Sequence, residues 1–259
     1  MKSTLKVSII TAVFNSNKTI EHCINSVLNQ NHKALEYIII DGGSTDGTVE
    51  IVKRYGDRIA KFISEPDNGM YDALNKGIGL ATGEIIGFLH ADDLYSSNEV
   101  IEKVAYQMEK YDVDSCYGDL LYVDRNDPSR INRYWKSGNY NPRKFFWGWM
   151  PPHPTFFVRR RVYDKYGHFN LELGSAADYE LVLRFLLKHG ITTKYIPEVL
   201  IKMRVGGISN ATVKNRIAAN RMDRKAWEVN GLKPYPWTVL FKPIRKLPQW
   251  FLRPKNLRK

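Results

Sequence analysis

A short apolar run that ends in two adjacent carboxylates constrains this sequence more than any other feature. Residues 84–93 read Glu-Ile-Ile-Gly-Phe-Leu-His-Ala-Asp-Asp, and such an uninterrupted apolar run is typical of a strand buried on both sides in a parallel sheet. Ligands of open α/β sheets bind beyond the carboxyl ends of the strands, where Asp92 and Asp93 would lie. Carboxylate oxygens suit hard cations, so the stretch predicts a cation site; a helix cap beside a solvated acid is the alternative.

Two earlier predicted strands also end in polar side chains. Residues 7–14 are followed by Asn15, and residues 36–40 are followed by Asp41. A short strand is predicted at 60–63, and helical spacing of apolar residues predicts helices over 19–30, 48–55, 69–81 and 98–111. This alternation favours a parallel sheet covered on both faces, with the polar strand ends forming a nucleotide-binding crevice. A G-x-G-x-x-G loop and a Walker sequence are absent, which argues against dinucleotide and P-loop sites.

The second half of the chain has a different pattern. Beyond residue 111 we predict a strand at 116–123, an aromatic stretch over 125–148 and a rigid proline-rich loop at 150–154. A strand at 156–158, a helix over 178–189, an edge strand over 191–203 and a basic helix over 212–231 follow. No repeat or low-complexity linker interrupts them. We therefore expect one domain over residues 1–210 and an appended segment over 211–259.

The charge of the chain is concentrated near its end. The formal net charge is +12, and residues 233–259 hold eight Lys and Arg residues and no acid, interleaved with Trp237, Phe241, Trp250 and Phe251. Such a basic, amphipathic segment favours an anionic membrane surface, with packing on the domain or disorder as the alternative. Cys23 and Cys116 fit no zinc or disulfide pattern, and no signal peptide or membrane-spanning run is present. We expect a cytoplasmic protein, peripheral at the inner face of the membrane.

Four motifs together resemble the family 2 glycosyltransferases, most closely the bacterial members that build exopolysaccharide, capsule and lipopolysaccharide. They are the strand at 7–15, Asp-Gly-Gly-Ser-Thr-Asp-Gly-Thr at 41–48, Asp-Asn-Gly-Met-Tyr-Asp-Ala-Leu-Asn-Lys-Gly at 67–77, and Ala-Thr-Gly-Glu at 81–84 leading into His-Ala-Asp-Asp at 90–93. The resemblance runs from about residue 7 to residue 209. It implies the GT-A fold (a Rossmann-like, mostly parallel sheet with helices on both faces), a nucleotide-sugar donor, a divalent cation (Mn²⁺ or Mg²⁺) and inversion at the anomeric carbon.

The resemblance also assigns residues to the donor site. It implies that Thr11, Val13 and Asn15 line the nucleotide pocket and that Asp41 contacts the base, usually uracil. Asp72, Asn75 and Lys76 would lie near the donor.

The aspartate-rich end would hold the ribose and the cation. The resemblance places Asp92 toward the ribose and on the cation, and Asp93 on the cation. His90 stands where many members carry an acid, which removes one carboxylate. An imidazole can ligate Mn²⁺, although a packed or hydrogen-bonded histidine is the ordinary alternative.

The acceptor hydroxyl needs a general base, which contributes roughly 10²–10⁴ in rate. Family members carry a catalytic acid at the start of the helix that begins near residue 178, which points to Asp178. Glu180 is the competing candidate, and a helix cap is the structural alternative. His153 resembles an acceptor-side loop position that orients a hydroxyl or the diphosphate. Arg204 and Ser209 flank a glycine turn suited to the donor diphosphate, or an ordinary turn.

These features predict an inverting, metal-dependent glycosyltransferase that moves a sugar, expected to come from a UDP-sugar, to a lipid-linked or growing saccharide of the cell surface. The aromatics over 135–149 would stack on acceptor sugars or form core. One alternative is a degenerate sugar-binding module without catalysis, motivated by His90. A nucleic-acid-binding protein is less consistent, because acids at the sheet edge would repel phosphates. A nucleotidyltransferase would need a phosphate loop that is missing.

Overall fold

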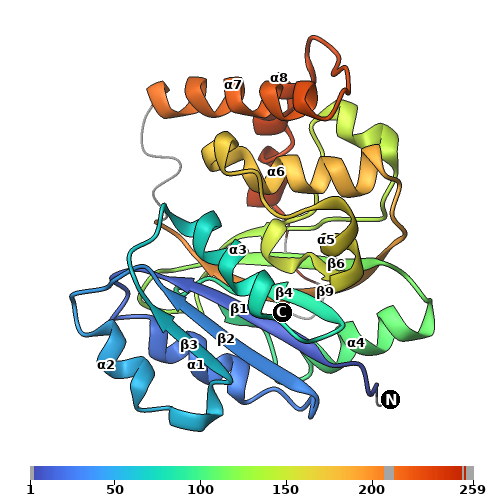
Figure 1. Cartoon of the computed structure of the whole chain (residues 1–259). Helices are drawn as coiled ribbons and strands as arrows, with labels where there is room; N and C mark the ends of the chain where they lie inside the picture. The colour runs from blue at the N-terminus through green and yellow to red at the C-terminus, as the bar shows by residue number, and fades with distance from the viewer. Residues whose placement is uncertain (1–2, 207–212, 253, 255–259) are drawn as a thin grey trace.

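The computed structural model describes residues 3–206, 213–252 and 254. Through these residues runs a nine-stranded sheet in the order β3-β2-β1-β4-β8-β6-β9-β5, with β7 paired to β6 and helices on both faces (Figure 1). The strands are β1 Val7–Val13, β2 Leu35–Asp41, β3 Lys61–Ser64, β4 Ile85–Phe88, β5 Leu94–Tyr95, β6 Ser115–Val123, β7 Ile131–Trp135, β8 Phe157–Arg159 and β9 Thr193–Arg204. The α-helices are α1 Ile20–Leu28, α2 Thr48–Lys53, α3 Met70–Leu80, α4 Val100–Lys110, α5 Arg160–Tyr166, α6 Ala177–Val182, α7 Val213–Val229 and α8 Thr238–Ile244.

The first four strands form the parallel half of the sheet, as the sequence predicts. β1 pairs with β2 on one side and with β4 on the other, and β3 pairs with β2, all in parallel. Val13 lies opposite Asp41, and Ile10 lies opposite Phe88. Since parallel strands point the same way, β1, β2 and β4 deliver the segments after them to a single edge of the sheet.

Alternation along the strands builds one hydrophobic core on each face of this sheet. In β1, Ile10 and Ala12 face a core shared with α3, α5 and α6. Val7, Ile9 and Val13 face the opposite core, shared with α1, α2 and α4. Successive side chains of a strand point to opposite faces, so a strand buried on both sides is mostly apolar. The two polar residues of β1, Ser8 and Thr11, are hydrogen-bonded to Glu36 and Tyr37. The organising strand β4 is buried at every position, as expected.

The second half of the sheet adds antiparallel pairs and corrects one prediction. β8 runs antiparallel to β4 and to β6, and β7 runs antiparallel to β6. The sequence predicts an edge strand over 191–203, but β9 lies inside the sheet because β6 covers one side and the two-residue β5 covers the other. The predicted helix over 178–189 is present as α6, which continues as a π-helix over Leu183–Lys188.

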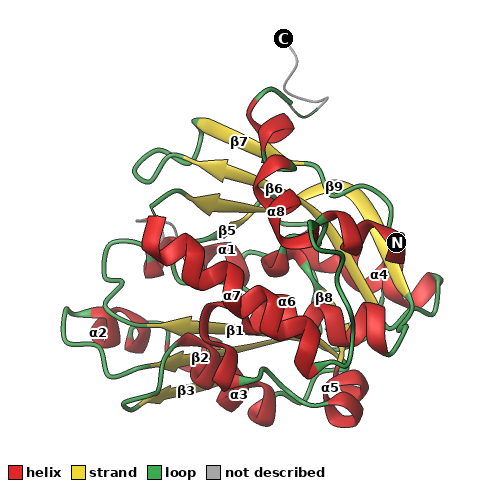
Figure 2. Ribbon diagram, turned by 90° about the horizontal axis from the view of Figure 1, so that it is seen from above, coloured by secondary structure: helices red, strands yellow, loops and turns green. Residues whose placement is uncertain are grey.

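The described part of the C-terminal segment packs on the domain. α7 lies along α6, where Trp227 Nε1 donates a hydrogen bond to Tyr179 Oη at 2.9 Å, and α8 follows beneath it (Figures 1 and 2). Lys242 Nζ of α8 lies 2.6 Å from an Asp223 carboxylate oxygen. The segment forms α8, which contains Pro243, and then a 3₁₀ turn over Leu247–Trp250 with a proline in its first positions. Across the described residues, no helix is both long enough and apolar enough to cross a membrane.

Candidate active site

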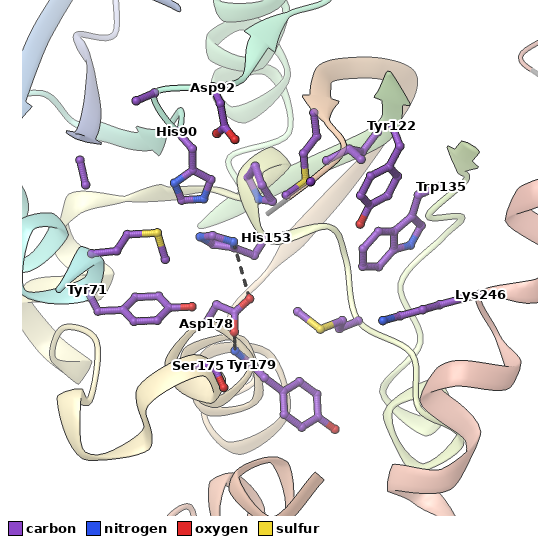
Figure 3. A pocket seen from close by; sticks show the side chains of 18 of the residues that line it. Tyr71, His90, Asp92, Tyr122, Trp135, His153, Ser175, Asp178, Tyr179 and Lys246 are labelled. Atoms are coloured by element: carbon purple, nitrogen blue, oxygen red, sulfur yellow. Dashed lines mark hydrogen bonds and ion pairs between the residues drawn. The ribbon is translucent and has the colours of Figure 1, made fainter. Parts of the chain in front are cut away.

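A cavity of about 1510 Å³ opens at the carboxyl edge of the parallel strands. Its walls come from five parts of the chain: the end of β1, the start of α3, the turn after β4, the β6–β7 pair with the loop 148–154, and the start of α6 facing the C-terminal segment. Figure 3 shows side chains from these segments converging on one space. The edge predicted to bind a ligand therefore borders the cavity.

The end of β1 contributes two of its three predicted residues. Val13 and Asn15 line the cavity. Asn15 has a φ of 45°, a left-handed conformation that asparagine tolerates better than most residues, and its Oδ1 accepts a hydrogen bond from Thr45 N at 2.9 Å. Thr11 is fully buried on the α1 face, with its hydroxyl 3.1 Å from Tyr37 Oη. The prediction that Thr11 lines the pocket is therefore not supported, because its side chain is enclosed in the core beneath Val13, two residues before the end of β1.

Asp41 stabilises the turn beside the cavity instead of lining the cavity. Its side chain is fully buried, and Oδ2 accepts hydrogen bonds from Gly43 N at 3.1 Å, Ser44 N at 3.0 Å and Ser64 Oγ at 2.7 Å. The neighbouring Gly42 reaches the cavity wall. The predicted contact between Asp41 and a base is thus replaced by an indirect role, in which the carboxylate shapes the turn.

The three predicted residues of α3 lie behind the wall of the cavity. Asn75 exchanges two hydrogen bonds with the backbone of Phe169, at 2.9 and 3.0 Å. Lys76 Nζ lies 2.8 Å from Glu65 Oε1 and 3.8 Å from Asp72 Oδ2. The wall itself is formed by the residues just before them, namely Asp67, Gly69, Met70 and Tyr71. The Asp67–Gly77 motif therefore contributes to the site, but it does so with the residues at its start and not with the three predicted residues.

The turn after β4 separates the two aspartates. Asp92 and His90 line the cavity, whereas Asp93 is fully buried and its Oδ1 accepts a hydrogen bond from Arg204 N at 3.3 Å. Burial, reinforced by the charge of Asp92, raises the pKa of Asp93 well above its usual range. The assignment of Asp93 to the cation needs correction, because its carboxylate does not reach the cavity and its neutral form is favoured.

Arg204 fixes this turn from inside the protein. It is only 3% exposed, its Nη1 donates to the Asp92 carbonyl oxygen at 2.6 Å, and its Nη2 lies 3.1 Å from His22 Nδ1. A guanidinium bound to a backbone carbonyl positions the turn. Its predicted contact with the donor diphosphate is not seen in this arrangement. Ser209, predicted beside it, lies outside the described residues.

Two histidines and Asp178 meet at the centre of the cavity (Figure 3). His153 Nδ1 lies 3.6 Å from Asp178 Oδ2, and the rings of His153 and His90 are 5.1 Å apart. Burial raises the pKa of Asp178, and it lowers the pKa of His90 and of His153 to about 4. At neutral pH both imidazoles are therefore neutral, and in each ring one nitrogen donates a hydrogen bond and the other accepts one.

Glu180, the competing candidate, is placed elsewhere. It is 3% exposed and forms an ion pair with Arg184, with Oε1 2.9 Å from Nε. Asn230 Nδ2 also donates to the same oxygen at 3.1 Å. Because its oxygens are engaged in the interior, Asp178 is the carboxylate that faces the cavity from α6.

Several wall residues were not predicted as part of the site. They come from β6, from the residue after β7 and from the C-terminal segment, whose cations were interpreted only as a membrane signal; they include Tyr122, Lys136, Lys242, Arg245 and Lys246. Trp135, from the aromatic stretch predicted to stack on acceptor sugars or to form core, also lines the cavity. This arrangement could not be predicted from the sequence, because more than 100 residues lie between β7 and α8.

Comparisons with known proteins agree with this geometry. Residues 8–167 match the model of a protein family described as glycosyl transferase family 2. The chain belongs to glycosyltransferase family 2. An uncharacterised glycosyltransferase of Mycobacterium tuberculosis is 34% identical over 189 residues, covering 72% of this chain and 71% of the relative. A PGL/p-HBAD biosynthesis glycosyltransferase of Mycobacterium bovis is 28% identical over 211 residues, covering 80% of each chain.

Solved structures show the same GT-A fold as this glycosyltransferase. Staphylococcus aureus TarS, residues 1–349 in complex with UDP-GlcNAc, superposes with a TM-score of 0.66 at 20% identity, over 84% of this chain and 65% of that chain. The mannosyltransferase PcManGT of Pyrobaculum calidifontis, in complex with GDP-Man and Mn²⁺, superposes with a TM-score of 0.62 at 19% identity, over 93% of this chain and 68% of that chain. The predicted fold class is confirmed.

The cavity offers a restricted set of ligands for a divalent cation. Within the described ranges, no group of three or more His, Cys, Asp and Glu residues could hold a metal ion. Asp92 and His90 both face the cavity at the sheet edge. Mg²⁺ commonly binds through one or two carboxylates, substrate phosphates and water, so these side chains fit a cation that arrives with a nucleoside diphosphate.

Proposed function

We propose that this glycosyltransferase transfers a sugar, with inversion, from a nucleotide sugar to a hydroxyl of a lipid-linked or growing saccharide in cell-surface polysaccharide synthesis. The observation that carries the proposal is that Asp92 and Asp178 face the same cavity from different elements. An inverting transfer requires the base to approach the anomeric carbon from the side opposite the leaving diphosphate, so base and diphosphate site must come from different elements.

The donor is bound at the carboxyl edge of β1 and β4. Val13, Asn15 and Asp92 line this end, with Gly42 at the turn that Asp41 shapes. The solved TarS structure with UDP-GlcNAc and the PcManGT structure with GDP-Man support a nucleotide sugar as donor. We assign uridine as the nucleoside because of the resemblance described above.

Asp92 holds the cation, Mn²⁺ or Mg²⁺, with His90 as its neighbour in the turn. When bound, this cation would neutralise the charge that develops on the departing nucleoside diphosphate. Asp92 faces the cavity because Arg204 binds its backbone carbonyl, which fixes the orientation of the turn. His90 is neutral at working pH, since burial lowers its pKa to about 4.

Asp178 takes the proton of the attacking hydroxyl. Burial raises its pKa, and a base whose pKa lies closer to the working pH accepts a proton more effectively. His153 lies 3.6 Å from the carboxylate and orients it. The sugar would pass through an oxocarbenium-like state, as in glycoside hydrolysis.

The acceptor would reach the cavity from an anionic membrane surface at the inner face of the cell membrane. Of the thirteen large hydrophobic side chains that are exposed in the described ranges, seven lie in residues 235–252; they are Tyr235, Trp237, Ile244, Leu247, Trp250, Phe251 and Leu252. Exposed Lys233, Arg245 and Lys246 complete a basic amphipathic surface of the kind that binds anionic headgroups.

A second candidate function is a nucleotide-sugar-binding protein without catalysis. It is favoured by His90, which replaces an acid that many family members carry. Calorimetric titration with UDP and GDP, with and without Mn²⁺, tests the donor site that both functions share. We expect Mn²⁺-dependent binding of UDP that is lost in Asp92→Asn; no nucleotide binding by the wild type with any metal would overturn the proposed donor site.

A further inference from the structure

The end of the cavity away from the parallel strands is formed by β6, β7 and the C-terminal segment. Tyr122 of β6 and Trp135 of β7 present their rings to the cavity, and Lys246 of the C-terminal segment extends into the same space just below Trp135 (Figure 3). Arg133 stacks on the Tyr122 ring at 3.6 Å and lies 5.7 Å from the Trp250 ring, so β7 and the C-terminal segment are in contact. Residues far apart in the sequence therefore build one wall.

Most cations of the cavity lie at the end away from the parallel strands. Asp67, Asp92 and Asp178 line the donor end and the centre, where Lys18 is the cation among the described lining residues. The wall formed by β6, β7 and the C-terminal segment, with α7 behind it, carries five cations and a single acid among the described residues; they are Arg125, Lys136, Lys242, Arg245, Lys246 and Asp223. Lys242 lies 2.6 Å from Asp223, so these two charges compensate each other.

We propose that this wall is an acceptor subsite for a saccharide that carries a phosphate group. The inference rests on the proposed function and names the chemical class of its acceptor. Arg245, Lys246 and Lys136 would bind the phosphate, because clustered cations raise the local concentration of anions and form strong charge-assisted hydrogen bonds with phosphate oxygens. Tyr122 and Trp135 supply broad apolar faces with polar edges, which suit a sugar ring.

The position of Asp178 gives the subsite its role in transfer. Figure 3 places Asp178 between Tyr71 on one side and Lys246 on the other, with His153 directly above it. A saccharide held on Trp135 would thus present a hydroxyl toward Asp178, with its phosphate directed toward Lys246.

The test measures acceptor binding while the donor end is filled. The full-length protein is saturated with UDP or GDP, whichever binds, together with Mn²⁺, and is then titrated with farnesyl diphosphate, glucose 1-phosphate and octyl glucoside. We expect the two phosphorylated ligands to bind at least tenfold more tightly than octyl glucoside. Tighter binding of farnesyl diphosphate than of glucose 1-phosphate would indicate a lipid-linked phosphate, and equal binding would indicate a soluble sugar phosphate.

Variants test whether the phosphorylated ligand binds at this wall. Lys246→Gln and Arg245→Gln should each weaken farnesyl diphosphate binding roughly tenfold, while Lys225→Gln, at an exposed cation of α7 that does not line the cavity, should leave it unchanged. Nucleotide binding should stay within twofold of wild type in all three. Equal affinities for phosphorylated and neutral ligands, or unchanged affinity in both wall variants, would overturn the inference; loss of nucleotide binding by the wild type would instead overturn the proposed function.

Discussion

The Nδ1 atom of His153 lies 3.6 Å from the Oδ2 atom of Asp178, inside a cavity that also contains His90. The three side chains come from the turn after β4, from the proline-rich loop and from the start of α6. Each is buried enough to disfavour its charged form. Asp178 and His153 therefore combine a carboxylate of raised pKa with a neutral imidazole, and this combination suits proton transfer near neutral pH.

Asp178→Asn should remove transfer and spare donor binding. We expect the transfer rate to fall by about 10²–10⁴, the contribution of a positioned general base. Calorimetric affinity for the nucleotide should stay within about threefold, because Asp178 comes from α6 and not from the ends of β1 and β4, where the nucleotide is proposed to bind. Full transfer activity in this variant would reject the base assignment.

Asp92 and Asp93 should respond differently to the same substitution. Asp92→Asn should abolish the Mn²⁺ dependence of nucleotide binding, since Asp92 faces the cavity. Asp93→Asn should leave that dependence intact, because the carboxyl is buried against Arg204 N and is expected to be neutral. The reverse pattern in paired titrations would restore Asp93 as the cation ligand.

Transfer should depend on pH through Asp178. The base acts when it is deprotonated, so the rate should fall as pH decreases through its folded pKa, which burial raises above the ordinary value of about 4. A pH–rate profile for wild type should therefore show an acid limb above pH 4. An acid limb centred at or below pH 4 would contradict a buried base.

His153 should make the protein less stable in acid. Its folded pKa of about 4 lies below the unfolded value of about 6.5, so the unfolded state binds more protons between these values. The stability that this group contributes is present above pH 6.5 and is lost as pH falls to 4, by up to about 3 kcal/mol. Urea unfolding at pH 7 and pH 4.5 should show a smaller loss in His153→Gln than in wild type; an equal loss would show that the histidine is not buried as described.

Two glycines of α3 offer a matched test of how closely this helix approaches β1. A Cβ atom on Gly77 would lie 2.4 Å from Ile10 Cγ2, whereas one on the exposed Gly79 meets nothing within 4 Å. Gly77→Ala should therefore destabilise the protein by about 1–3 kcal/mol through overpacking. Gly79→Ala should stabilise it by up to about 1 kcal/mol, because alanine favours helices. Equal effects in urea unfolding would refute this packing.

Much of the fold follows from local pattern. Largely apolar runs over β1, β2 and β4 predicted buried parallel strands, and polar residues at their ends predicted the ligand edge. The position of β9 could not be predicted, because its place inside the sheet depends on β5, a strand of two residues with no periodic signal.

The site was predictable only in outline. The motifs marked Val13, Asn15, Asp92, His153 and Asp178, all of which line the cavity. The sequence could not show which of the two aspartates faces the cavity. Adjacent residues of a turn point in different directions, and the direction of each depends on how the turn packs. Neither could it show that Thr11 and Asp41 bind other parts of the protein, or that Lys246 joins the wall, because those contacts depend on residues distant in sequence.

The most direct test of the central claim is to incubate the wild-type protein with Mn²⁺, a panel of UDP- and GDP-sugars and a bacterial lipid extract, and to measure nucleoside diphosphate release and glycosylated lipid by mass spectrometry. The account predicts release from at least one UDP-sugar, matched by an equal amount of glycosylated lipid, and neither product with Asp178→Asn. Nucleotide binding without any glycosylated product, across all donors, would contradict transfer and favour a protein that only binds its nucleotide sugar.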